Sequence, residues 1–157
     1  MSPSPTRLDA KLPPPLVMLA CGAAAWAAAH LLPALAVAVP ARVPLAIAVA
    51  VIALSIELAA AALFFRRRTT VNPLKPHTAT QLVVDGPNRF SRNPMYVGQA
   101  LLLAGWALWL AHALAPLGAV AYVLWITRFQ ILPEERALAA LFGEDYAAYR
   151  ARTPRWL

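Results

Sequence analysis

The sequence predicts an all-α integral membrane protein whose four transmembrane helices form two hairpins. Of its 157 residues, 61% are hydrophobic and only 13% are charged, which is typical of a membrane protein and not of a soluble domain of this size. Several apolar runs are long enough to cross a bilayer, and most of the cations lie at their ends. We expect residues 1–15 to be a flexible cytoplasmic tail and residues 16–157 to form a single membrane domain.

The net charge of +7 indicates which loops stay in the cytoplasm, because Lys and Arg accumulate there. Proteins that bind nucleic acid instead carry a basic patch or stripe on a soluble domain. We therefore expect the membrane as a partner and no nucleic acid. The single Cys21 allows no intramolecular disulfide, and His30 and His112 have no partners at metal-ligand spacing, so no metal site is expected.

The first hairpin is predicted from two apolar segments, residues 16–39 and 43–65, joined by a turn. The first segment contains no Asp, Glu, Lys or Arg, and the second contains only Glu57. Each can cross a hydrocarbon core of about 30 Å at about 1.5 Å per residue. A retained hairpin is favoured over a cleaved signal peptide, because the first run exceeds a signal h-region and a second run follows at once. Three arginines, 66–68, mark the cytoplasmic end.

Glu57 lies nine residues before Arg66, about 13 Å into the membrane at helical rise. An ionised carboxylate is costly at that depth, so we expect its side chain to face the bundle interior, uncharged or hydrogen-bonded. Two interpretations stay open. Glu57 lines a substrate cavity, or it makes a hydrogen bond that packs two helices together.

Residues 66–94 are predicted to form a cytoplasmic loop, because four breaker pairs that contain proline or glycine interrupt them. Only residues 80–84 look extended. Such backbone cannot face lipid, so the loop must lie at the cytoplasmic surface or line a water-accessible cavity. It is a candidate for binding a polar ligand.

The second hairpin is predicted from residues 95–127, which contain no charged residue. They could form one long tilted helix or two shorter helices that turn near His112 to Pro116. Two crossings return the C-terminal arginines to the side that holds Arg66 to Arg92, in agreement with the positive-inside rule. We therefore predict spans at about 95–112 and 114–131, with both termini in the cytoplasm.

The C-terminal segment, residues 133–152, is predicted to be an amphipathic helix. It begins with Pro133, Glu134 and Glu135, which suits the positive end of a helix dipole. Apolar and aromatic residues then recur at spacings of three and four, with a break near Gly143. From the local sequence, dipole compensation alone explains the two glutamates.

Two sequence motifs resemble those of a known family. Arg92-Asn93-Pro94-Met95-Tyr96-Val97-Gly98 resembles the Arg-His-Pro-x-Tyr-x-Gly element of the isoprenylcysteine carboxyl methyltransferase family and the related phospholipid methyltransferases. The second element of that family, a glutamate pair followed by Phe-Gly-x-x-Tyr-x-x-Tyr, is matched by Glu134-Glu135 and residues 142–149. The resemblance covers residues 69–157.

The resemblance implies a methyltransferase that uses S-adenosylmethionine, with S-adenosylhomocysteine as the product. It places the cofactor pocket at the cytoplasmic end of the last helices, formed by the loop and the C-terminal helix. Catalytic roles are implied for Arg92, Arg128 and Glu135, and substrate contacts are expected at Arg92, Arg128 and Glu57. The residues implied in cofactor binding are Leu82, Val83, Asn88, Asn93, Pro94, Met95, Tyr96, Gly98, Glu134 and Glu135.

The sequence departs from the family pattern at two positions. Asn93 replaces the usual histidine, so an amide hydrogen bond is retained there but proton transfer is lost. The eukaryotic members have an arginine directly before their glutamates, whereas here the nearest is Arg128, six residues before Glu134.

Methyl transfer from a sulfonium is an in-line displacement, so we expect a lipophilic acceptor from the bilayer to meet the cofactor near Arg92, Tyr96 and Glu135. A carboxylate acceptor is already ionised near neutral pH. Phospholipid amines and thiols, the alternative acceptors, must first lose a proton. Of the three histidines, only His77 is a candidate to accept that proton, and a position on the loop surface explains it equally well. This favours a carboxylate acceptor.

Two other classes of protein are the alternatives: a reductase of the sterol-reductase type that uses NADPH, and a non-catalytic membrane subunit. The Ala-rich composition suits a multi-pass protein of a bacterial inner membrane.

Overall fold

The computed structural model describes residues 11–67 and 81–157, and these fold into helices and connecting segments, without a β-strand; the segment before α3 contains a 3₁₀ turn, Gly86–Arg89. The all-α class is therefore confirmed for this part of the chain. The predicted tail up to residue 10, Arg68, His77 and the middle of the predicted 66–94 loop lie outside the described residues. Residues 82–84, predicted to be extended, belong to no helix or strand.

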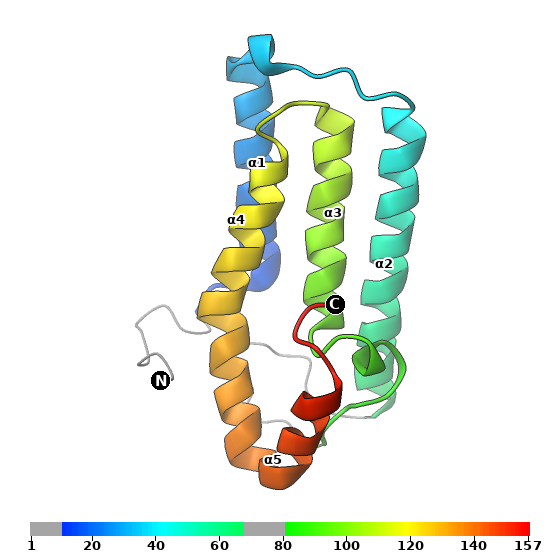
Figure 1. Ribbon diagram of the computed structural model, residues 1–157, viewed down its shortest axis with the longest axis vertical. Helices are drawn as coiled ribbons and strands as arrows, with labels where there is room; N and C mark the ends of the chain where they lie inside the picture. The colour runs from blue at the N-terminus through cyan, green and yellow to red at the C-terminus, as the bar shows by residue number, and fades with distance from the viewer. Residues whose placement is uncertain (1–10, 68–80) are drawn as a thin grey trace.

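The first two helices, α1 (Pro14–Leu31) and α2 (Arg42–Arg66), run in opposite directions along the long axis of the molecule (Figure 1). Both are long and apolar enough to cross a membrane. Helix α1 ends short of the predicted residue 39, because Leu32 precedes Pro33 and leaves the helical region (φ −125°, ψ 56°). Proline disfavours helical geometry at the preceding residue and lacks an amide hydrogen. A 3₁₀ turn, Pro33–Leu35, follows.

Helices α3 (Pro94–Leu110) and α4 (Pro116–Ile126) form the second hairpin, with opposite directions in Figure 1. Helix α3 ends where Ala111 adopts a left-handed conformation (φ 48°), and α4 begins at a proline, which suits the first turn of a helix. The chain thus turns back at residues 111–115, as predicted, instead of continuing as one long helix.

Glycines on α3 let this helix approach α2 closely. A Cβ atom added at Gly98 would lie 3.0 Å from the carbonyl oxygen of Ala53 and 3.0 Å from Cβ of Glu57. One added at Gly105, two turns further along the same face, would lie 3.3 Å from the carbonyl oxygen of Ala46. The path of α3 is therefore fixed by backbone contact with α2.

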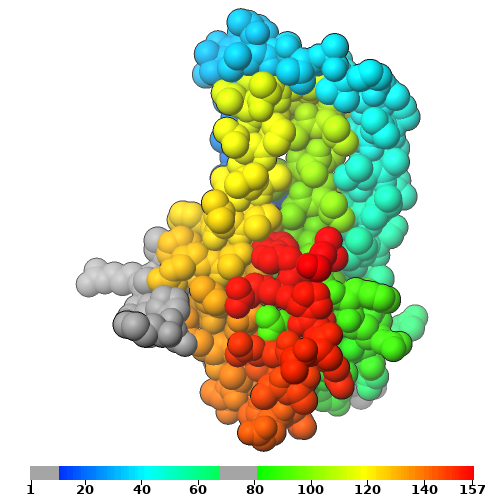
Figure 2. Space-filling view, in the orientation of Figure 1, coloured from blue at the N-terminus to red at the C-terminus, as the bar shows by residue number. Residues whose placement is uncertain are grey.

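Helix α4 continues through a π-helical turn, Thr127–Ile131, into α5 (Leu132–Arg152). The predicted break at Gly143 is confirmed, since this residue has non-helical angles (φ 46°, ψ −118°) that glycine adopts at little cost. The second half of α5 turns back toward the start of α3, and residues 153–157 follow it upward (Figure 1). Figure 2 shows these residues, in red, between the orange α5 and the green start of α3.

Candidate active site

Two segments about forty residues apart in sequence meet where α3 begins and α5 begins. The hydroxyl of Tyr96 donates a hydrogen bond of 2.6 Å to Oε1 of Glu134. Nη2 of Arg92 forms an ion pair of 3.0 Å with Oε1 of Glu135. Because the α3–α4 hairpin returns the chain to its starting end, the two family motifs come into direct contact.

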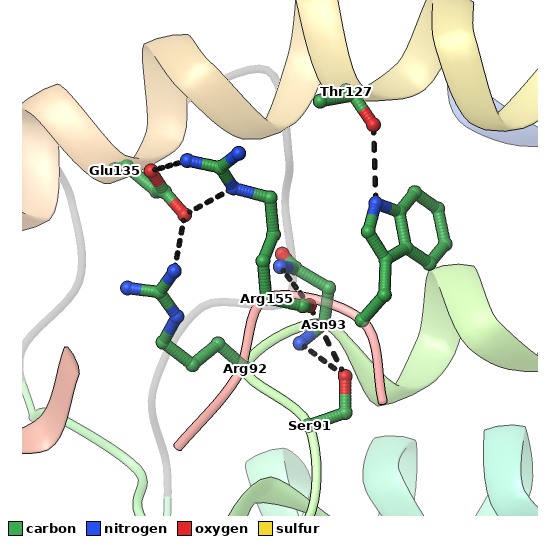
Figure 3. A network of polar contacts seen from close by, with 7 residues as sticks. Ser91, Arg92, Asn93, Thr127, Glu135 and Arg155 are labelled. Atoms are coloured by element: carbon green, nitrogen blue, oxygen red, sulfur yellow. Dashed lines mark hydrogen bonds and ion pairs between the residues drawn. The ribbon is translucent and has the colours of Figure 1, made fainter. Parts of the chain in front are cut away.

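Glu135 is only 8% exposed and is held by two arginines. Arg155 donates from Nε to Oε1 at 2.9 Å and from Nη2 to Oε2 at 2.8 Å, and Arg92 is the second partner (Figure 3). A buried carboxylate needs such partners, because desolvation of an unpaired charge is costly. Two cations around one anion leave this cluster with an excess positive charge. Compensation of the helix dipole is therefore not the sole role of Glu135.

Arg92 has two donors without an acceptor. Its side chain is 9% exposed, and Nε and Nη1 are buried without a hydrogen-bond partner in the described part of the chain. A buried donor without an acceptor costs free energy. The N–H of Nε points to the side of Nη2, whereas Nη1 lies on the side of Cδ, so Nε and Nη1 would each donate to a separate acceptor atom. We call them the open donors of Arg92; they suit acceptor atoms of a ligand while Nη2 remains paired with Glu135.

Asn88 provides a second buried polar group without a partner. Its side-chain Oδ1 is buried and accepts no hydrogen bond within the described residues, while its main-chain oxygen accepts a 2.7 Å bond from the hydroxyl of Tyr149. Oδ1 can accept a hydrogen bond from an amino or ammonium group. Donors on Arg92 and an acceptor on Asn88 thus suit a ligand that carries both an acid and an amine.

Glu134 has an environment different from that of its neighbour. Its Oε1 accepts hydrogen bonds from Tyr96 and, at 2.7 Å, from Nε2 of Gln130. Although the residue keeps some exposed surface, desolvation of the carboxyl group raises its pKa to about 7. The two hydrogen bonds lower that pKa and the charge of Glu135 raises it. Near neutral pH, Glu134 can therefore accept or donate a proton.

Residues 153–157, which we call the C-terminal strap, lie against the loop that precedes α3. The main-chain N–H of Arg92 donates to the carbonyl oxygen of Pro154 at 2.9 Å. Nδ2 of Asn93 and Oγ of Ser91 donate to the carbonyl oxygen of Arg155 at 2.9 Å and 3.3 Å (Figure 3). Asn93, the replacement for the family's histidine, therefore contacts the strap.

The strap also reaches the α4–α5 junction. Nε1 of Trp156 donates a 3.1 Å hydrogen bond to Oγ1 of Thr127, and its side chain packs against the core cluster that includes Tyr96 and Tyr122. Arg155 and Trp156 were not among the predicted site residues. Their only local signal is a cation beside an aromatic residue, and neither residue belongs to the two family motifs.

Glu57 makes the interhelical hydrogen bond expected of a packing role. Nε2 of Gln99 donates to its Oε1 at 3.1 Å, and the hydroxyl of Tyr122 donates to Oε1 of Gln99 at 2.6 Å. Gly98 faces the same part of α2. Helices α2, α3 and α4 are therefore joined by a polar chain within the bundle.

The remaining predicted residues differ in burial. Val83 and Pro94 are buried, whereas Leu82 and Met95 are partly buried. Arg128 lies in the π-helical turn with its guanidinium 5.3 Å from the ring centroid of Phe129. Among the described residues, no group of three or more His, Cys, Asp or Glu side chains is arranged to hold a metal ion.

Fold and site together define a helical protein with apolar helices of membrane-spanning length and a polar two-part site at one end. The sequence model of the phospholipid methyltransferase family matches residues 41–145, which is more than half of the chain. The chain therefore belongs to this family, and the resemblance drawn from the two motifs is confirmed. The family makes the protein a methyltransferase that acts on lipid-like substrates.

A curated protein of Haemophilus influenzae, described as an uncharacterized protein, is 43% identical to the chain over 63 residues. The aligned region is 40% of this chain and 100% of that protein. No solved structure matches the chain.

Proposed function

We propose that the protein transfers the methyl group of S-adenosylmethionine to a lipophilic acceptor that reaches the site from the membrane. The observation that carries this proposal is the direct contact of the two family motifs, through Tyr96 with Glu134 and Arg92 with Glu135. Neither motif could form a pocket alone, because each supplies only part of the polar groups.

The proposal includes four membrane crossings, by α1 to α4. Helices α3 and α4 lie alongside α1 and α2 and share their long axis (Figure 1), and residues 95–127 contain no charged side chain. Arg66, Arg92 and Arg128 lie near the end that carries the site, whereas Arg42 begins α2 at the other end. From the positive-inside rule we infer that the site and both termini face the cytoplasm.

The polar groups of the site fit S-adenosylmethionine, which carries a carboxylate and two positive groups. An open donor of Arg92 suits one oxygen of the carboxylate. Glu134 and Oδ1 of Asn88 suit the ammonium or the adenine amino group, and Leu82 and Val83 offer apolar contact to the ring. When bound, the cofactor supplies an electrophilic methyl group.

An apolar groove between α1 and α3 supports delivery of the acceptor from the bilayer. Its volume is about 470 Å³, within the range of about 300–1,000 Å³ usual for small-molecule sites. Leu103 lines the groove and also belongs to the core cluster that contains Tyr96. The other lining residues are Met18, Leu19, Gly22, Ala23, Trp26, Leu102 and Trp106. A hydrocarbon chain in this groove would lie along α3, whose first turn carries Tyr96.

Two acceptor chemistries follow from two different side chains. A carboxylate needs no proton acceptor, and an open donor of Arg92 or the guanidinium of Arg128 would hold it. An amine, such as a phospholipid headgroup, must lose a proton, and Glu134 with a pKa of about 7 can take it. From the sequence, a carboxylate was preferred because no side chain was well placed to take a proton from an amine. Glu134 can take that proton, so it supports a phospholipid amine as the second candidate acceptor.

Isothermal titration of the detergent-solubilised protein with S-adenosylhomocysteine tests the cofactor assignment. We expect saturable binding at one site, and no binding by folded protein would refute the proposal. A thermal-shift comparison with NADPH tests the reductase class, and stabilisation by neither ligand would favour the non-catalytic subunit.

The acceptor is then identified by transfer of a labelled methyl group to fatty acids, isoprenoid acids, prenylcysteine analogues, phospholipid amines and lipophilic thiols. The pH dependence separates the mechanisms. The rate with an amine should rise as Glu134 loses its proton near pH 7, whereas the rate with a carboxylate needs no such rise.

A further inference from the structure

We propose that the C-terminal strap is part of the active site, and that Arg155 is a positioning residue that orients Glu135 and, through it, Arg92. This inference rests on the proposed function, because it concerns how the same site is held ready for a ligand. It assigns a role to residues beyond 145, where the family match ends.

Arg155 fixes the orientation of Glu135 by contacting both of its oxygens. The two hydrogen bonds, 2.9 Å to Oε1 and 2.8 Å to Oε2, form the bidentate geometry that arginine makes with carboxylates. One such pair defines the carboxylate plane as well as its distance. Oε1 is thereby presented to Nη2 of Arg92 at 3.0 Å, and this ion pair leaves Nε and Nη1 of Arg92 as open donors.

The main chain of the strap is fixed at the same time by the first family motif. Carbonyl oxygens of Pro154 and Arg155 accept hydrogen bonds from the N–H of Arg92 and from the side chains of Asn93 and Ser91. Arg155 therefore binds one motif through its carbonyl group and the other motif through its guanidinium group. The strap thus makes hydrogen bonds to both Asn93 and Glu135.

Trp156 provides an anchor that does not involve charge. Its indole N–H is bonded to Thr127, and its ring packs on the core cluster. The strap also adds a cation, since Arg92 and Arg155 together outnumber Glu135 by one charge. A segment that only covered the core would need the tryptophan but not the arginine. The charge of Arg155 is thus available to favour an anionic ligand group at an open donor of Arg92.

The test compares Arg155→Gln and Arg155→Lys with Arg152→Gln, which changes an exposed arginine three residues earlier. The full-length variants, in detergent, are titrated with S-adenosylhomocysteine by calorimetry. We expect Arg155→Gln to weaken binding about tenfold, the equivalent of one charge-assisted hydrogen bond. Arg155→Lys should recover part of this loss, and Arg152→Gln should bind as the wild type does.

Chemical rescue separates positioning from a merely structural role. Millimolar guanidinium chloride should restore part of the affinity lost in Arg155→Gln, whereas sodium chloride at the same concentration should not. Wild-type affinity in Arg155→Gln would overturn the inference while leaving the proposed function intact. Absence of binding by the wild type would overturn both.

If Arg155→Gln fails to fold, Arg155→Lys decides the matter, because lysine keeps the charge but cannot make the bidentate contact. Weaker binding by this folded variant, together with unchanged binding by Arg152→Gln, supports the inference. Unchanged affinity of Arg155→Lys would overturn it.

Discussion

Glu134→Gln gives the most direct test of the electrostatics of the site. The change removes the titrating group but keeps an oxygen that can accept the hydrogen bonds of Tyr96 and Gln130. Burial raises the pKa of Glu134 from 4.5 to about 7. The folded protein therefore binds a proton more tightly at this position than the unfolded chain does, and stability falls as the pH rises from about 4.5 to about 7.

The size of this effect follows from the two pKa values. They differ by about 2.5, and one pKa unit corresponds to about 1.4 kcal/mol, so the wild type loses about 3 kcal/mol across this pH range. For a chain of this length, that loss corresponds to a decrease of about 6–12 °C in melting temperature.

Thermal unfolding in detergent, followed by tryptophan fluorescence between pH 4 and pH 8, measures this loss. Glu134→Gln should show a melting temperature with a much weaker dependence on pH. Glu144→Gln, a change at an exposed glutamate of the same helix, should retain the wild-type dependence. If Glu134→Gln kept the full wild-type decrease, Glu134 would not be the group whose pKa is raised, and its assignment as a proton acceptor would fail.

Three further changes probe the site, the helix packing and the groove. Glu135→Ala removes the anion between two arginines and should weaken S-adenosylhomocysteine binding at least about tenfold in calorimetry. If the variant bound with the affinity of the wild type, Glu135 would only compensate the helix dipole. Gly98→Ala places a Cβ 3.0 Å from the backbone oxygen of Ala53 and should cost about 1–3 kcal/mol of stability in thermal unfolding; an unchanged melting temperature would contradict this close approach. Gly22→Leu should fill the groove and raise KM for a long-chain acceptor without changing cofactor affinity; an equal rise for a short-chain acceptor would exclude a chain-binding groove.

Local chemistry made much of the fold predictable. Pro116 could only begin a helix, and Gly143 is the residue best suited to end one, so the turn of the second hairpin and the bend in α5 were both expected. The end of α1 was placed too late, because hydrophobicity continues through Leu32 and Pro33 although helical geometry does not. The hydrophobicity of a segment does not show where its helix ends, because a proline can end the helix while the apolar segment continues.

The site was predictable only where the motifs supplied the residues. Glu134 and Glu135 are adjacent in sequence, and successive side chains on a helix point about 100° apart, so they had to face different partners. Nothing local showed that one would meet Tyr96 and the other would meet Arg92. The contact with Arg155 depends on a bend and a reversal of the chain after Gly143, and such long-range pairing leaves no periodic signal in the sequence.

The position of the strap has a consequence for the order in which the protein is assembled. The bonds from Asn93 to Arg155 and from Tyr149 to Asn88 join residues 62 and 61 positions apart, whereas the α3–α4 hairpin closes over a turn of a few residues. Contacts between residues far apart in sequence form later than local contacts, because closing a longer loop costs more chain entropy before the contact adds any stabilisation. During synthesis, the residues of α1 to α5 all precede Arg155. The contacts that tie the strap to Asn93 and Glu135 are therefore among the last tertiary contacts of the described residues that can form.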